Sequence, residues 1–182
     1  MLKFRQMGLA GLLVSALLMS PLGFAKGQAV KLSLSHIEKI KTTEESGDEL
    51  YFSVTEYSSV ERPRQITVPS FPTYWLSKHL SNVNDVVLWE KELADKESVM
   101  LVISLIERDA PPWNVDDLIG TVKLKISNDH GKLKRAWSIP NAAETKRLDD
   151  NKNEFQMTGD GGDYKLSLQV EQEKEVSVQK AR

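Results

Sequence analysis

Four carboxylates lie close together in one stretch of the sequence, at Glu107, Asp109, Asp116 and Asp117. Ca²⁺ takes about six to eight oxygen ligands, and carboxylates from one loop can supply several of them. Without a cation, the same charges repel one another. This acidic loop, residues 107–117, therefore predicts a calcium site at these four residues. The alternative is an acidic loop that is simply solvated.

The residues inside the acidic loop also suggest a contact surface. Pro111 and Pro112 stiffen the backbone and cannot donate ladder hydrogen bonds. Trp113 follows them at the tip, where an amphipathic aromatic side chain can insert into a membrane or a protein surface. We therefore expect Trp113 and Val115 to contact a partner. The alternative for Trp113 is that it folds back over the prolines.

The acidic loop is flanked by two predicted β-strands. Residues 99–106 are apolar on both faces, with Ser104 as the single polar residue, which predicts a strand in the middle of a sheet and covered on both sides. Residues 118–127 alternate apolar and polar residues, so this strand is expected to bury one face only. The carboxylates should therefore lie at one end of a β-sandwich.

The rest of the chain shows the same pattern of short alternating segments. About eight strands, separated by turn residues, predict an all-β fold: an eight-stranded antiparallel sandwich of two sheets. Residues 72–80 are expected to form one helical stretch, because Pro72 suits a first turn and Leu76 and Leu80 lie four apart. Residues 159–163, Gly-Asp-Gly-Gly-Asp, predict a hairpin turn and not a phosphate loop, because they do not open a helix.

The first 25 residues have the features of a secretory signal peptide. Lys3 and Arg5 give a basic start, residues 7–19 are apolar, and Ala25 ends a site that a signal peptidase recognises. The alternative is a membrane anchor. Cleavage would leave one domain at residues 26–172 and a polar tail at 173–182. We then expect a periplasmic or secreted protein with no transmembrane segment.

The composition argues against several other functions. There is no cysteine, which excludes disulfides, zinc–thiolate sites and cysteine nucleophiles. The net charge is −2 and like charges do not form long runs, so no nucleic-acid partner is expected. The three histidines lack a metal-binding spacing, and no serine lies in a Gly-x-Ser-x-Gly elbow. Paired general acids at Glu44 and Glu45 or at Glu107 and Asp109 stay an open alternative.

Several segments of the chain resemble C2 domains. Residues 47–54, Gly-Asp-Glu-Leu-Tyr-Phe-Ser-Val, resemble the pattern in which an Asp closes the first C2 loop and an aromatic follows in the next strand. Glu-x-Asp at 107–109, followed by Asp-Leu-Ile-Gly at 117–120, resembles the later C2 loop. Residues 89–93, Trp-x-Lys-Glu-Leu, fit the stretch that precedes the central strand in that family.

This resemblance implies a fold and a ligand. C2 domains are eight-stranded sandwiches, and many of them bind Ca²⁺ and then phospholipid or protein through these loops. The ligand positions that it implies are Asp48, Glu107, Asp109 and Asp117. The sequence departs from the family where an acid is expected at Thr42, although Glu44 and Glu45 lie nearby, and where Glu107 replaces an Asp. The loop before Asp117 is also longer than the family's.

Together, the residues and the resemblance predict an exported, non-catalytic binding module. It would contact a lipid or protein partner through its acidic loops, with Ca²⁺ as its cofactor. The alternatives are a cell-envelope hydrolase or enzyme inhibitor that uses the same loops, and a structural envelope protein with a vestigial calcium site.

Overall fold

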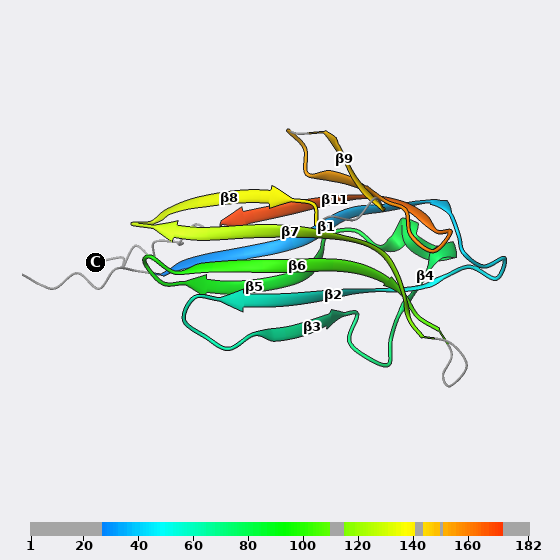
Figure 1. Cartoon of the computed structure of the whole chain (residues 1–182), viewed down its shortest axis with the longest axis horizontal. Coiled ribbons are helices and arrows are strands. Elements are labelled where there is room, and N and C mark those ends of the chain that lie inside the picture. Colours follow the sequence, from blue (N-terminus) through cyan, green and yellow to red (C-terminus); the bar gives the residue numbers. More distant parts are fainter. Residues whose placement is uncertain (1–26, 110–114, 141–143, 150, 173–182) are drawn as a thin grey trace, which may run out of the picture.

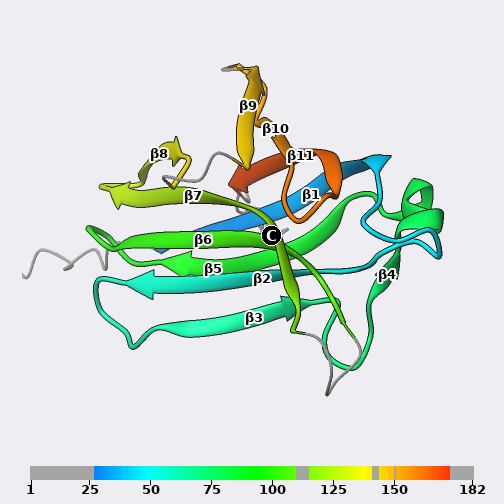
Figure 2. The same cartoon turned by 45° about the vertical axis from the view of Figure 1, so that its right-hand side comes forward.

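The computed structural model describes residues 27–109, 115–140, 144–149 and 151–172. These residues form two antiparallel β-sheets that pack around one apolar core (Figures 1 and 2). The prediction of an all-β sandwich is confirmed, although the described residues contain eleven strands and not eight. The predicted signal peptide, Trp113 and the polar tail lie outside the described residues.

The first sheet has the strand order β5-β1-β11-β10-β9. Its strands are β1 (Gln28–Lys41), β5 (Val86–Leu93), β9 (Thr145–Asp149), β10 (Glu154–Met157) and β11 (Asp163–Gln172). The second sheet has the order β3-β2-β6-β7-β8, with β4 paired to β2. Its strands are β2 (Glu49–Ser58), β3 (Arg64–Val68), β4 (Trp75–Leu76), β6 (Ser98–Glu107), β7 (Asp117–Asp129) and β8 (Lys132–Ser138).

The two-residue period of the strands decides which side chains form the core. Along β6, Val99, Leu101, Ile103 and Leu105 all face inward and are buried. Tyr164, which is on β11 in the other sheet, is also fully buried. Each such side chain contributes about 1.5–3 kcal/mol when it is fully removed from water, so these positions dominate the stability of the sandwich.

The central strand differs from the prediction in one respect. β6 lies in the middle of its sheet, between β2 and β7, as expected. Its outer face is not covered, because Met100 is 38% exposed and Val102 and Ile106 are only half-buried. No third layer packs there in the part of the chain that the structure describes. Cross-strand neighbours shield these residues instead: Met100 lies opposite both Tyr57 and Lys125.

Residues 72–80 were expected to form one helix, but they contain a short strand and a short 3₁₀ helix. Trp75 and Leu76 form β4, and Ser77–Asn82 form the short 3₁₀ helix η1. Trp75 pairs with Leu50 of β2, and its ring packs against Phe52 at 6.1 Å in an edge-to-face arrangement. This tertiary contact overrides the local helical pattern. Among the described residues η1 is the only helix, and none there has the length and apolar character needed to cross a membrane.

Three connections that carry acidic residues lie at one end of the sandwich. Figure 1 shows the β1–β2 loop, the adjoining ends of β6 and β7 and the β10–β11 hairpin together at its right-hand end, whereas the β7–β8 and β5–β6 turns lie at the left. The β10–β11 hairpin forms as predicted, with Met157 opposite Tyr164. We call this end of the molecule the acidic end.

Candidate cation site and the neighbouring cavity

At the acidic end, the inward-facing positions next to β2 and at the end of β6 carry acidic residues in place of apolar ones. Asp48 lies just before β2 on the same face as Leu50, and Glu107 takes the next inward position after Leu105. Asp48 is fully buried, and Glu107 is only 3% exposed. Since Leu50 lies opposite Glu107 in the sheet, both carboxylates reach the same end of the core.

Asp48 is held by hydrogen bonds from the chain itself. Its Oδ1 accepts the backbone N–H of Thr43 at 2.9 Å, the Thr43 hydroxyl at 2.8 Å and the backbone N–H of Glu44 at 3.1 Å. The Tyr164 hydroxyl donates to Oδ2 from the opposite sheet. Burial and this contact with Asp48 raise the pKa of Tyr164, which keeps it a donor. Asp48 therefore fixes the β1–β2 loop and joins the two sheets.

Glu107 belongs to a different arrangement, which we call the carboxylate cluster: Glu44, Glu107 and Asp109. One carboxylate oxygen of each residue lies within 4.8 Å of the others. In the part of the chain that the structure describes, no group donates a hydrogen bond to the buried Glu107 carboxylate and no cationic side chain pairs with it. Oδ2 of Asp109 is likewise shut off from solvent without a hydrogen-bond partner among those residues.

The electrostatics of the cluster follow from this burial and crowding. Burial, and then the charges of Asp109 and Asp48, raise the pKa of Glu107 to about 8. Glu107 therefore holds a proton at neutral pH when no cation is near. A bound cation would favour its charged form and displace that proton.

Asp117 lies beside the carboxylate cluster, at the start of β7 and opposite Glu107. The neighbouring Asp160 carboxyl group, then burial and the charge of Asp109, raise the pKa of Asp117 to about 6. Asp160 is in the turn of the β10–β11 hairpin. The sequence pattern predicted the turn correctly but did not indicate that Asp160 would meet the acidic loop.

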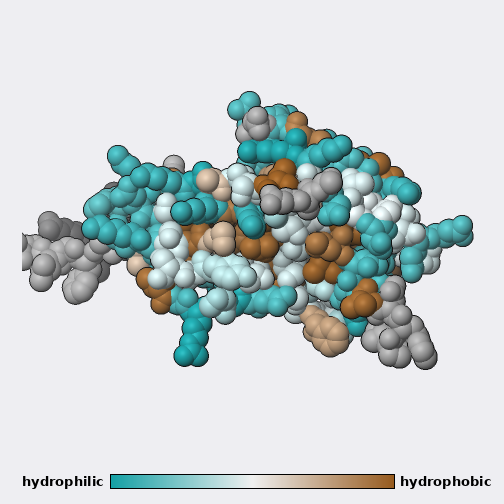
Figure 3. All heavy atoms as spheres, viewed as in Figure 1, coloured by the Kyte–Doolittle hydropathy of each residue, from teal (hydrophilic) through white to brown (hydrophobic). Residues whose placement is uncertain are grey.

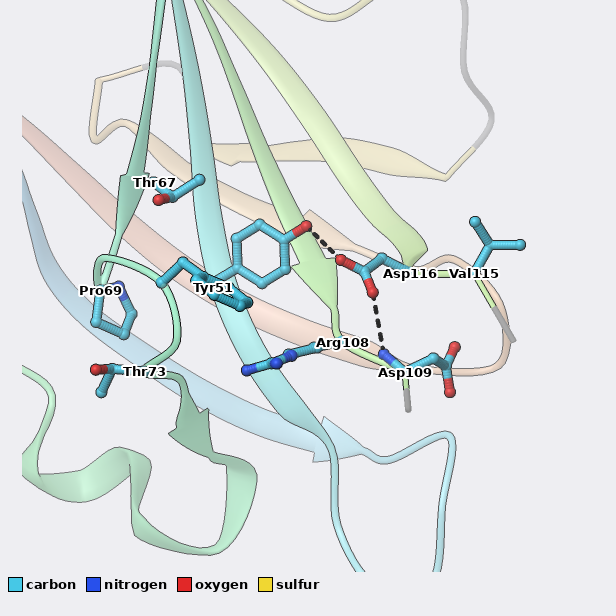
Figure 4. A pocket seen from close by; sticks show the side chains of 9 residues that line it. Tyr51, Thr67, Pro69, Thr73, Arg108, Asp109, Val115 and Asp116 are labelled. Atoms are coloured by element: carbon cyan, nitrogen blue, oxygen red, sulfur yellow. Dashed lines mark hydrogen bonds between the residues drawn. The ribbon is translucent and has the colours of Figure 1, made fainter. Parts of the chain in front are cut away.

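Asp116 was predicted as a cation ligand, but in the structure its carboxylate is used by Tyr51 and by the backbone of Asp109, and it does not belong to the carboxylate cluster. Its Oδ2 accepts the Tyr51 hydroxyl at 2.7 Å, and its Oδ1 accepts the backbone N–H of Asp109 at 3.2 Å (Figure 4). Burial and the hydrogen bond with Asp116 raise the pKa of Tyr51 to about 12. The Asp109 carboxylate points away from Tyr51 in the same view. Asp116 therefore bonds to Tyr51 and to the Asp109 backbone, whereas the Asp109 carboxylate belongs to the cluster.

A cavity of about 450 Å³ lies beside Asp116 and Asp109. Tyr51, Phe71 and Arg108 are among the residues that line it. The Arg108 guanidinium lies 5.0 Å from the centre of the Phe71 ring and donates to the carbonyl of Pro72 at 2.7 Å. Arg108 follows Glu107 in the strand direction and so points to the opposite face of the sheet. It organises the cavity wall, not the carboxylate cluster.

Exposed apolar side chains surround this end of the molecule. Val115, a predicted contact residue, is 81% exposed, and Phe71 is 77% exposed. Leu118 is also exposed at the start of β7. On the face seen in Figure 3, apolar side chains lie over the middle and towards the acidic end, while the end with the β7–β8 turn is mostly hydrophilic. Trp113, the other predicted contact residue, lies outside the described residues.

No protein-family model, curated protein or solved structure matches this chain. The likeness to C2 domains, and everything it implies, therefore stays a prediction. Of the predicted ligands, the structure groups Glu107 and Asp109, together with Glu44, and places Asp117 opposite Glu107 in the sheet. It surrounds Asp48 with its own donors and pairs Asp116 with Tyr51.

Proposed function

We propose that this protein is an exported, non-catalytic binding module that takes Ca²⁺ at the carboxylate cluster and contacts a lipid or protein surface through the adjoining loops. One observation carries this proposal. Glu107 is buried beside two other carboxylates, and the described residues supply neither a hydrogen-bond donor nor a cation for it. A buried carboxyl group either keeps a proton or is stabilised as a carboxylate by pairing or by coordinating a metal. The described residues supply no pairing group, so a bound metal ion would take the place of the proton that Glu107 otherwise holds.

The donor set favours calcium over other cations. Glu44, Glu107 and Asp109 offer only carboxylate oxygens, which are hard ligands suited to Ca²⁺. The chain has no cysteine, and none of its three histidines belongs to the cluster, so the soft and nitrogen ligands of zinc and copper sites are lacking. Two of the ligands come from the acidic loop and one from the β1–β2 loop, so binding would tie the two loops together.

The surface contact is supported by the neighbouring side chains. Phe71 and Val115 are large, apolar and well exposed on the loops beside the cluster. Exposed apolar groups gathered at one place favour contact with a membrane or a protein surface. A bound cation would also remove the negative repulsion between this end of the molecule and an anionic surface.

Thermal melting in Ca²⁺ and in chelator tests the cation site. A hundredfold excess of Ca²⁺ over its Kd should stabilise the fold by about 2.7 kcal/mol. For a domain of this size the melting temperature should rise by roughly 5 to 10 °C. Glu44→Gln should reduce this rise, because it removes a ligand. Glu45→Gln is the matched control, since Glu45 is exposed in the same loop and outside the cluster, and it should respond as the wild type does.

Equal melting temperatures of the wild type in Ca²⁺ and in chelator would refute the cation site. Cosedimentation with phosphatidylserine vesicles, with and without Ca²⁺, then tests the surface contact. Loss of sedimentation in chelator supports a lipid partner, and no sedimentation in either condition favours a protein partner.

A further inference from the structure

We propose that the cavity beside Arg108 binds a small amphiphilic anion, with a carboxylate or phosphate head at the Arg108 guanidinium and an apolar body against Tyr51 and Phe71. This inference goes beyond the proposed function, because it needs no cation at the carboxylate cluster. The sequence did not indicate this cavity, since its walls come from β2, the end of β3, the β3–β4 connection and the acidic loop.

The cavity has the size and the lining of a small-molecule site. Its volume of about 450 Å³ lies within the range of about 300–1,000 Å³ that is usual for ligand pockets. Such pockets are mostly apolar and use a few polar groups to orient the ligand. Tyr51, Pro69 and Phe71 give this cavity apolar walls. Because the Phe71 ring is well exposed, a bound ligand would also remove apolar surface of the protein from water.

The Arg108 guanidinium is a cation in this wall that has donors left for a ligand. It is half-buried, and one terminal nitrogen donates to the carbonyl of Pro72 at 2.7 Å. Among the described residues, no carboxylate pairs with the guanidinium and it makes no other hydrogen bond. Arg64 on β3, in contrast, is paired with the buried Glu56 at 2.6 Å. Since a guanidinium has five N–H donors, Arg108 can bind an anionic head through two of them and keep its bond to Pro72.

The guanidinium is held in place before any ligand binds. It lies 5.0 Å from the centre of the Phe71 ring and 5.6 Å from the centre of the Tyr74 ring. The backbone N–H of Arg108 also donates to the carbonyl of Glu49 at 2.7 Å, which fixes the start of the side chain. Ligand binding therefore has to immobilise little of the Arg108 side chain, which favours affinity.

The acidic residues in the lining leave this part of the cavity to an anion. In Figure 4 the Arg108 guanidinium points toward Thr73, whereas the Asp109 carboxylate points the opposite way. Both carboxylate oxygens of Asp116 already accept hydrogen bonds. The hydroxyls of Thr67 and Thr73 also line the cavity, make no hydrogen bond with the described residues and can donate to the head group.

Titration of the whole chain with three eight-carbon probes, followed by NMR amide shifts in the presence of chelator, tests this inference. Octanoate and octyl phosphate carry the two anionic heads, and 1-octanol has the same chain without a charge. At least one anionic probe should bind about tenfold more tightly than 1-octanol or better, because hydrogen bonds between charged groups are strong. The amides of residues 71–73 and 107–109 should shift, and the tighter anionic probe identifies the head group.

Variants separate the anionic head from the apolar body. Arg108→Gln should weaken binding of the anionic probe at least about tenfold and leave binding of 1-octanol as it was. Arg62→Gln is the matched control, since Arg62 is exposed in the β2–β3 connection and outside the cavity, and it should bind as the wild type does. Thr73→Trp fills the cavity from its exposed rim and should abolish binding of all three probes, so the test stays decisive if Arg108→Gln folds poorly.

Three results would overturn this inference. The first is equal affinity of the wild type for the anionic probes and for 1-octanol, the second is unchanged anion binding in Arg108→Gln or in Thr73→Trp, and the third is no binding of any probe. Because chelator is present throughout, none of these results bears on the cation site, which melting in Ca²⁺ tests separately.

Discussion

Along β2 and along β6, the row of side chains that faces the core has a buried carboxylate at each end. At the acidic end these are Asp48 and Glu107. At the opposite end they are Glu56 and Glu97, which are also buried. The same alternation therefore places acids above and below one apolar core, and the two ends can be compared directly.

The end that contains Glu56 and Glu97 supplies its own cation. Lys91 on β5 of the other sheet lies 3.0 Å from Glu56, 2.9 Å from Glu97 and 2.7 Å from Glu61. Glu56 also accepts hydrogen bonds from Trp89 Nε1 at 2.7 Å and Arg64 Nε at 2.6 Å. Burial acts to raise the pKa of Glu56, but these hydrogen bonds outweigh it and hold the pKa below its ordinary value.

The acidic end contains no such cation among the described residues, so Glu107 has a pKa raised to about 8. The pKa of Glu97, at the other end of the same strand, is lowered: its hydrogen bonds, first that of Lys91, outweigh burial. Burial is therefore common to both ends, and the presence of a protein cation decides the direction of the shift. Perturbed carboxylates often mark functional sites, which supports the cation site that we propose at the end without a protein cation.

The largest expected effect is the loss of the internal cation. Lys91→Met should destabilise the fold by about 3–5 kcal/mol, because it leaves Glu56 and Glu97 buried without their partner. Urea unfolding at neutral pH measures this. Glu61→Gln is the control: its side chain is 57% exposed, and its loss should cost less than about 1 kcal/mol. Similar losses in both variants would show that the buried acids are not what makes Lys91 important.

A smaller loss of stability is expected when the hydrogen bonding of Asp48 is disturbed. Asp48 is the carboxylate at the acidic end that accepts hydrogen bonds from the chain itself. Tyr164→Phe removes the hydroxyl that Asp48 accepts from the opposite sheet. Since a hydrogen bond to a charged group contributes about 1.5–3 kcal/mol, the free energy of unfolding should fall by that amount. Equilibrium denaturation of the two proteins gives the difference directly. No measurable change would mean that the Thr43 and Glu44 donors suffice for Asp48.

The pH dependence of stability should differ between the two ends. Between the ordinary Glu value of about 4.5 and the folded value of about 8, folded Glu107 holds a proton that the unfolded chain has lost. Cation-free stability should therefore fall as pH rises through this window, by up to about 1.4 kcal/mol per pH unit, and level off above it. Glu56 and Glu97 have lowered pKa values, so their contribution is lost only as pH falls below the ordinary range.

Denaturation of the cation-free protein at several pH values tests this contrast. Glu107→Gln should flatten the decline between about pH 4.5 and 8 and leave the loss of stability at lower pH as it was. A decline that persists over this window in the variant would assign it to another group.

The alternation of apolar and polar residues in the sequence was sufficient to predict most strands and which of their faces are buried. The two-residue period identified the strands and their buried faces, and the spacing of Glu107, Asp109 and Asp117 indicated that acidic side chains would gather at one end of the sandwich. The same period also extends through Glu97 and Glu107, so the acids at both ends of the core could have been recognised from the sequence. The exposure of the outer face of β6 could not be recognised from the sequence, because apolar composition does not show how many layers pack on a sheet.

Only the tertiary structure decided which distant side chains meet. Asp160 lies near Asp117 because Gly159 lets the β10–β11 hairpin lie on the start of β7. Lys91 reaches Glu56 because β5 and β2, in different sheets, come together at one end of the sandwich. Asp116, next to Asp117 in sequence, turns instead to Tyr51. Alternation assigns each residue to a face of its own strand, whereas pairing register and sheet packing determine its neighbours across the fold.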